Sequence, residues 1–131
     1  MIVQRALVLV AAVAAVAWLA VSYGDARLIR HAQVAAADPK AGAAELESAL
    51  ADARGAGSGA EPLAYQASLN IRLHQLGEAR RLLEQLVRRE PETPEAWFLI
   101  AELTQRSDPA LAARARGRLH QLDPLGAPAQ P

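Results

Sequence analysis

Apolar residues recur with helical spacing through the second half of the chain. Between residues 79 and 87, and again between 111 and 122, they fall on one face of a helix while charged residues occupy the other face. The residues of the two stripes are Ala79, Leu82, Leu83, Leu86 and Val87, then Leu111, Ala112, Ala115, Leu119 and Leu122. No run of alternating β-branched residues flanked by turns is present. The pattern therefore predicts an all-α chain.

Prolines and a glycine mark the ends of these helices. Pro94 and Pro109 each suit the first turn of a helix, where the missing amide is not needed. Thr93 and Asp108 stand one residue earlier, where an N-cap is expected. Gly77 predicts the turn inside the first of two helix pairs.

The N-terminal part carries a different pattern, an uninterrupted apolar run. Residues 6–23 are 18 residues without a charged side chain, and as a helix they would span about 27 Å, close to the apolar thickness of a bilayer. Trp18 and Tyr23 lie toward the far end, where amphipathic rings favour the interface. We expect residues 1-24 to be a retained single-pass N-terminal anchor. The alternative is a cleaved signal peptide, because small-x-small sites occur within residues 12–17, and cleavage would yield a secreted repeat protein.

Positive charges flank both ends of this run, with Arg5 before it and Arg27, Arg30 and Lys40 after it. They pull in opposite directions under the positive-inside rule. A short N-terminal tail on a signal-anchor usually stays inside, which favours a repeat domain outside the cytoplasm. A small-xxx-small spacing inside the run could pair two anchors, so a homo-oligomer is one expectation.

Residues 25-54 predict a juxtamembrane helix followed by a degenerate helix pair. Asp38-Pro39 repeats the N-cap and proline signal of Asp108-Pro109. Residues 55-60 are Gly-rich and predict a flexible linker, and residues 125-131 predict a disordered tail. A helix pair cannot bury its apolar face alone, so we expect residues 25-54 to cap the helices that follow.

Residues 61-124 contain two similar units. Leu63 aligned with Trp97 gives an offset of 34 residues, and the same offset places Ala67 over Ala101. The second helices of the two units agree nearly as well, and each closes on a proline. A period near 34 built from two helices resembles the tetratricopeptide repeat (TPR) family. The resemblance implies two TPR-like repeats stacked as a short α-solenoid behind an N-terminal transmembrane helix.

Three residues depart from the family pattern. Gln66 stands at a usually apolar position, and Thr104 stands where an aromatic residue is usual. Arg116 replaces a large apolar residue in the last helix, so we expect that helix to be less buried, as a terminal repeat can be.

The resemblance also implies a binding surface, because TPR proteins hold a partner in the groove lined by the first helix of each pair. Those helices are expected at residues 61–75 and 95–106. Phe98 is an aromatic residue left at the edge of the core stripe, which predicts either an anchor for a partner or packing against a cap or a neighbouring helix. The partner-binding candidates are Ser68, Arg72, Phe98, Glu102 and Gln105.

Composition and motifs give no indication of catalysis, metal binding or nucleic-acid binding. The formal net charge is +0, which gives no general attraction to nucleic acid, and the absence of cysteine excludes disulfides and thiolate metal sites. The three histidines lack ligand spacing, and no residue set suggests a nucleophile elbow or triad. We therefore expect no enzyme, no catalytic residue, no cofactor and no metal. The leading hypothesis is a membrane-anchored adaptor or scaffold for a protein or peptide partner in the membrane or envelope. The alternative is a structural accessory subunit of a larger membrane complex.

Overall fold

The structure is a computed structural model that describes the backbone of residues 2–125 and the side chains of residues 14–20 and 23–125. Within these residues the regular structure is entirely α-helical. The helices are α1 (Ile2–Ala37), α2 (Ala43–Gly55), α3 (Ala60–Arg72), α4 (Leu76–Arg89), α5 (Pro94–Thr104) and α6 (Pro109–Leu122). The all-α part of the predicted fold is confirmed.

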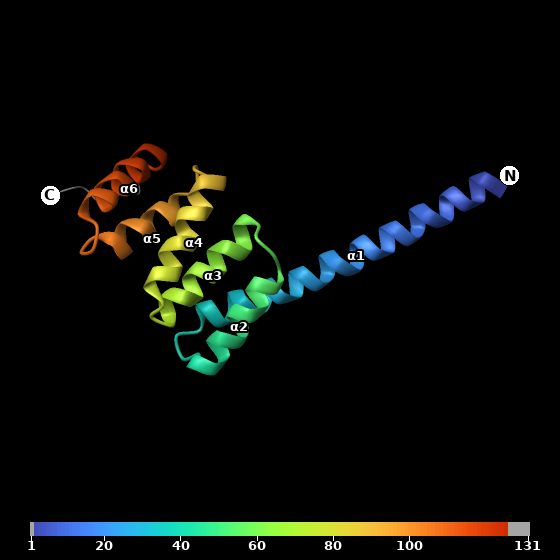
Figure 1. Cartoon of the computed structure of the whole chain (residues 1–131), viewed down its shortest axis with the longest axis horizontal. Helices are drawn as coiled ribbons and strands as arrows, with labels where there is room; N and C mark the ends of the chain where they lie inside the picture. Colours follow the sequence, from blue (N-terminus) through green and yellow to red (C-terminus); the bar gives the residue numbers. More distant parts are fainter. Residues whose placement is uncertain (1, 126–131) are drawn as a thin grey trace.

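Consecutive helices pack as antiparallel pairs, and the pairs stack in a row (Figure 1). The C-terminal part of α1 pairs with α2, α3 pairs with α4, and α5 pairs with α6. Neighbouring pairs are joined because α3 contacts both α1 and α2, while α4 contacts α5. The result is a solenoid-like stack from which α1 extends outward (Figure 1).

One core joins α3, α4, α5 and α6. Leu63 and Ala67 of α3 lie in the same cluster as Ile100 and Ala101 of α5, and Trp97 packs against it. Residues that are 34 apart in the sequence therefore lie in the same core. The other buried members are Leu82, Leu83, Leu86, Val87, Ala96 and Ala115. Small alanines at the contacts let the helices approach closely, in keeping with dense packing.

A second core joins the first pair to α3. It contains Ala32 and Ala35 of α1, a stripe of α2, and Leu69 of α3, which is fully buried. The stripe of α2 consists of Leu46, Ala49, Leu50 and Ala53. Because Leu69 belongs to this core and Leu63 to the other, α3 is the helix on which both cores are built.

Two polar side chains of α3 complete the helices of the first pair. Ala35 O would ordinarily accept a bond from the amide four residues later, but that residue is Pro39 and has no N–H. Arg72 Nη1 fills this place by donating to Ala35 O at 2.6 Å and to Ala36 O at 3.3 Å. Gln66 does the same for α2. Its Nε2 donates to Ala53 O at 3.1 Å.

This cap explains why a polar residue occupies a position that is usually apolar in the repeat. Gln66 is only 6% exposed, yet its amide nitrogen finds acceptors both at the end of α2 and at Gly57 O, 3.3 Å away. A buried amide without such partners would destabilise the fold. The departure from the family pattern is therefore a contact between the first pair and the repeats.

Two local predictions are wrong, and a third, the N-cap at Thr93, is confirmed in position only. α2 begins at Ala43 with Gly42 as its N-cap, whereas Asp38 Oδ1 accepts from Lys40 N at 2.8 Å and closes a turn instead of starting a helix. Thr93 precedes α5 as expected, but its side chain makes no capping bond. Gly77 lies inside α4 instead of in the turn before it.

The turn inside the first repeat is made by His74, whose φ of 57° lies in the left-handed region. His74 N donates to Ile71 O at 3.0 Å, and Gln75 N donates to Asn70 O at 2.8 Å, which is a Schellman ending. This turn ends α3 at Arg72, three residues before the predicted end.

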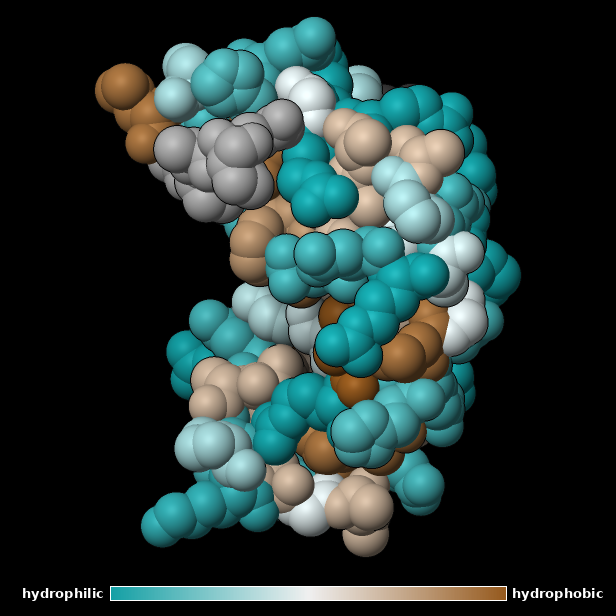
Figure 2. Space-filling model, turned by 90° about the vertical axis from the view of Figure 1, so that its left-hand side faces the viewer, coloured by the Kyte–Doolittle hydropathy of each residue, from teal (hydrophilic) through white to brown (hydrophobic). Residues whose placement is uncertain are grey.

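The last helix is less buried than its counterpart, as predicted. Ala112 and Ala115 are the buried residues of α6, whereas α4 has five. Figure 2 looks along the stack from the side on which α5 and α6 lie, and apolar residues show there between hydrophilic ones. The described part of the chain places no further helix over this end.

Among the residues with described side chains, no helix is long and apolar enough to cross a membrane. The anchor predicted at residues 6–23 includes 6–13, 21 and 22, whose side chains lie outside the described residues. The anchor therefore stays a prediction. From residue 126 onward, the predicted tail also lies outside the described residues.

Candidate functional site

The three candidates on α5 share one exposed face. Phe98, Glu102 and Gln105 are spaced four and three residues apart, which places them one above another on a helix. All three are exposed, and Phe98 retains 46% of its surface. Gln105 is the residue that ends α5. Among the described residues, neither Phe98 nor Glu102 makes a polar side-chain contact, so this face is open.

The two candidates on α3 are engaged within the chain. The Ser68 hydroxyl donates to Ala64 O at 3.0 Å, one turn earlier on the same helix. Arg72 is half-buried and donates to the carbonyls at the end of α1. These contacts give Arg72 a structural role, and its predicted role in partner binding stays a prediction.

A cleft of about 660 Å³ lies where the beginning of α4 meets the end of α5. We call it the α4–α5 cleft. Its lining residues are Leu76, Gly77, Arg80, Glu102, Leu103, Gln105, Arg106 and Ser107. The structure thus brings Glu102 and Gln105 into one cleft, whereas Ser68, Arg72 and Phe98 do not line it. Phe98 lies one helical turn from Glu102 on the same face of α5.

The apolar part of the cleft was not predicted from the sequence. Leu76 is 49% exposed at the first position of α4, and Leu103 is partly buried beside the core. One signal could have indicated it. Leu76 directly precedes Gly77, which the sequence predicts to lie in a turn, and a leucine beside a turn is expected to be exposed. Leu103 gave no such signal because it follows Glu102 within a helix.

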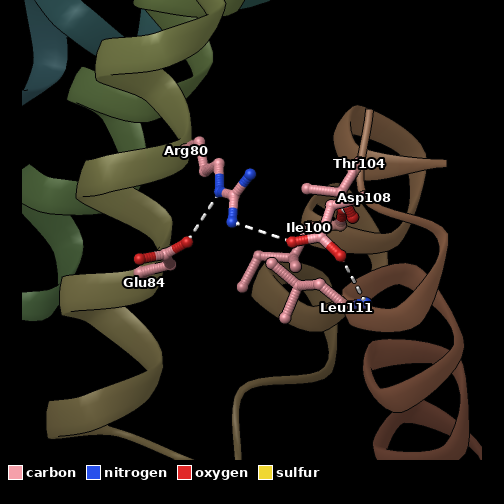
Figure 3. Close-up of polar contacts among 6 residues, drawn as sticks. All are labelled: Arg80, Glu84, Ile100, Thr104, Asp108 and Leu111. Atoms are coloured by element: carbon pink, nitrogen blue, oxygen red, sulfur yellow. Dashed lines mark hydrogen bonds and ion pairs between the residues drawn. The ribbon is translucent and has the colours of Figure 1, made fainter. Parts of the chain in front are cut away.

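One wall of the cleft is fixed by a network centred on Arg80 (Figure 3). Arg80 Nε donates to Glu84 Oε1 at 2.8 Å, and Arg80 Nη2 donates to Asp108 Oδ2 at 3.2 Å. The other oxygen of Asp108 accepts from Leu111 N at 3.0 Å and caps α6. The network ties α4 to the start of α6, so it fixes the two repeats relative to each other.

The same contacts shift the acid–base properties of their members. The Leu111 amide lowers the pKa of Asp108, and Arg80 lowers it further. The hydrogen bond from Arg80 to Glu84 raises the pKa of Arg80. The charged forms of both groups are therefore favoured in the folded chain. Arg80 is already paired, so its charge is largely unavailable to a ligand.

The opposite rim of the cleft carries charges that are not neutralised in this way. Glu102 and Arg106 are both exposed, and among the described residues neither takes part in an ion pair. The cleft thus combines apolar side chains with one free carboxylate and one free guanidinium. Such a mixture suits a peptide segment better than a small apolar molecule.

Thr104, which replaces the usual aromatic residue, lies behind this wall (Figure 3). Its side chain is buried, and its hydroxyl donates to Ile100 O at 2.7 Å, so the helix itself satisfies it. The substitution is therefore accommodated inside α5 and does not contribute a group to the cleft.

Residues with described side chains include no group of three or more histidines and carboxylates that could hold a metal ion. The nearest approach to such chemistry is a contact of 2.5 Å between His31 Nδ1 and Asp52 Oδ2. It joins α1 to α2 and involves two residues only, so it is a contact between helices.

Helix pairs that stack in a row around a shared core define an α-solenoid of helical repeats. Residues 60–103 match the family model of the tetratricopeptide repeat. The matched segment contains α3, α4 and all but the last residue of α5. The resemblance to the TPR family is therefore confirmed over this segment. Such repeats are typically scaffolds for protein–protein interaction and not enzymes. The comparisons with curated proteins and with solved structures gave no match.

Proposed function

We propose that this chain is a membrane-anchored TPR-type adaptor that holds a segment of another protein along α5 and in the α4–α5 cleft. The observation that carries the proposal is the exposure of two large apolar side chains beside one cleft. Phe98 is 46% exposed and Leu76 is 49% exposed, and both belong to the segment that matches the repeat family. Stacked helical repeats present binding surfaces of this kind.

The chemistry of the surface indicates what the partner segment contains. Covering the exposed half of Phe98 or Leu76 would contribute about 1 kcal/mol for each side chain, half the value for full burial. Glu102 and Arg106 on the rim would orient the segment more than they would strengthen it. The fitting partner is a peptide segment with an apolar side chain and charged groups of both signs.

The anchor completes the proposal. The described part of α1 before the repeat body exposes Val16, Trp18 and Leu19, at 67%, 69% and 59%. Large apolar side chains on an isolated helix are stabilised by contact with lipid. We propose that the repeats lie outside the cytoplasm, because the short N-terminal tail of a signal-anchor usually stays inside, and that the partner lies in the membrane or the envelope.

Site-specific photocrosslinking of the full chain in its native membranes tests the surface. A benzoylphenylalanine at position 98 is expected to give one discrete protein adduct, because this position would lie against the partner. The matched control carries the same group at Gln121, an exposed position on α6. If the adducts are identical at both positions, or absent at position 98, the proposed binding surface on α5 is refuted.

Three further measurements separate this proposal from its alternatives. The adduct formed from position 98 should decrease when Leu76→Ala is added, since the segment would lose an apolar contact in the cleft. Alkaline carbonate extraction tests the anchor independently, because an anchored chain stays in the membrane pellet. Full chain that is folded and monomeric in detergent argues against an obligate accessory subunit.

A further inference from the structure

One face of α1 changes character along its length. Val16, Leu19, Tyr23, Arg27 and Arg30 are spaced three, four, four and three residues apart, so they line one face of the helix. All five are exposed, and Tyr23 retains 76% of its surface. The face is apolar at the first two positions, aromatic at the third and cationic at the last two.

This face is turned away from the repeat body. The opposite face of α1 carries Leu28, Ala32 and Ala35, and it packs on α2 and α3. Leu28 Cδ1 lies 3.6 Å from the point that a Cβ atom would occupy on Gly55 of α2, and both alanines are fully buried. The apolar–aromatic–cationic face therefore contacts neither α2 nor α3.

The two arginines have no acidic partner on their face. Asp25 lies on the opposite side of α1, and Asp52 on α2 is engaged by His31. Among the described residues, no side-chain hydrogen bond or ion pair involves Arg27 or Arg30. Two unpaired guanidinium groups one turn apart can attract an anion, even though the chain as a whole has no net charge.

Along the helix axis, Arg27 lies at the depth of the lipid head groups when Tyr23 lies at their inner edge, and Arg30 lies just beyond them. At a rise of about 1.5 Å per residue, Arg27 lies about 6 Å and Arg30 about 10 Å beyond Tyr23. The polar region of one leaflet is roughly 5–8 Å thick, and aromatic rings favour its inner edge. Tyr23, Ala26, Arg27 and Arg30 also line a shallow hollow of about 200 Å³.

We propose that Tyr23, Arg27 and Arg30 form a binding surface for the phosphate of an anionic phospholipid head group. The proposal rests on the proposed anchor and specifies what its outer end binds. A guanidinium donates two parallel hydrogen bonds to a phosphate, which gives orientation as well as attraction. Each arginine near an anionic surface contributes about a fivefold preference for anionic lipid. The bound head groups set the depth of α1 and its rotation about its own axis.

Quenching of Trp18 fluorescence by brominated lipids measures this preference. The full chain is reconstituted into bilayers of phosphatidylcholine and phosphatidylglycerol, with bromine on the chains of one lipid at a time. Trp97 belongs to the repeat body and contributes a constant background. We expect brominated phosphatidylglycerol to quench more than its equimolar share, with a preference of fivefold or more.

The variant Arg27→Gln with Arg30→Gln should bring the preference to about one. Both positions are exposed, so helicity by circular dichroism should be unchanged. The matched control is Arg114→Gln with Arg118→Gln, which removes the same charge from α6 and should leave the preference as it is. If the first variant keeps the preference, or the control loses as much of it, the proposal is overturned.

Three further outcomes separate the head-group proposal from its alternatives. Inorganic phosphate at constant ionic strength should not reduce the preference, and competition by it would assign the surface to a free anion and overturn the head-group proposal. Equal quenching by both lipids would overturn it too, while leaving the anchor in place. If neither lipid quenches Trp18, the anchor fails, and the head-group surface fails with it.

Discussion

Replacing Arg72 by alanine should loosen the first helix pair while leaving the following repeats folded. Its guanidinium donates to Ala35 O at 2.6 Å and to Ala36 O at 3.3 Å, at the end of α1. Pro39 has no amide that could bond Ala35 O, and the Lys40 amide bonds to Asp38 Oδ1 and not to Ala36 O. Removing Arg72 therefore leaves both carbonyls without their partner.

The magnitude follows from the number and strength of these bonds. A hydrogen bond that involves a charged group contributes about 1.5–3 kcal/mol. Arg72 is half-buried and its second contact is long, so we take the lower end of that range, about 1.5 kcal/mol. A loss of that size raises the population of the locally opened first pair about tenfold.

Amide hydrogen exchange of the full chain in detergent, read by mass spectrometry, checks this value. Peptides from α2 and from the end of α1 should exchange about ten times faster in Arg72→Ala, while peptides from α5 and α6 keep their rates. The control Arg88→Ala removes an exposed arginine from α4 and should change neither group. Unchanged exchange in α2, or equal acceleration throughout, would show that Arg72 does not hold the first pair.

Four other substitutions test the core, an exposed apolar residue, the turn and the cap. Leu83→Ala should cost about 3 kcal/mol of unfolding free energy and Leu76→Ala about 1 kcal/mol, measured by urea unfolding, because Leu83 is 0% exposed and Leu76 49%. His74→Gly should raise the free energy of unfolding, measured with urea, by about 0.5–1 kcal/mol. Glycine adopts the φ of 57° without strain, and this gain exceeds the cost of its greater freedom in the unfolded chain. The pKa of Asp108 is lowered by the Leu111 amide, so its stabilisation is present above the unfolded pKa near 3.9 and is lost as the pH falls through the folded pKa. Melting temperatures from pH 7 to pH 2 should therefore fall less steeply in Asp108→Asn than in the parent chain.

The buried stripes could be predicted because periodicity depends on local spacing alone. The apolar residues assigned to the second helix of the first repeat, from Ala79 to Val87, are all buried. On α2, Leu46, Ala49, Leu50 and Ala53 recur with the same helical spacing and are also buried. The ends of the helices were predicted less well than their buried faces. Asp38-Pro39 has the same sequence signal as Asp108-Pro109, yet Asp38 accepts from Lys40 N in a turn while Asp108 caps a helix.

The roles of buried polar residues could not be predicted where they depend on contacts between helices. The sequence shows Gln66 as a departure from the TPR pattern and predicts Arg72 as a groove residue. In the structure, both side chains cap preceding helices. A cap supplied by another helix depends on how the pairs stack, and the local sequence does not contain that information. The candidate site shows the same division. The TPR resemblance indicates Glu102 and Gln105, but Leu76 joins them only because α4 begins beside the end of α5.

The position of α3 links the two proposals. Its Leu69 belongs to the core of the first pair, its Leu63 belongs to the core of the repeats, and its polar caps close α1 and α2. α1 is therefore fixed relative to the face of α5 through one continuous set of buried contacts. If head groups set the rotation of α1, they also set the direction in which Phe98 faces. A variant that frees α1, such as Arg72→Ala, should then weaken partner crosslinking from position 98 without altering the surface itself.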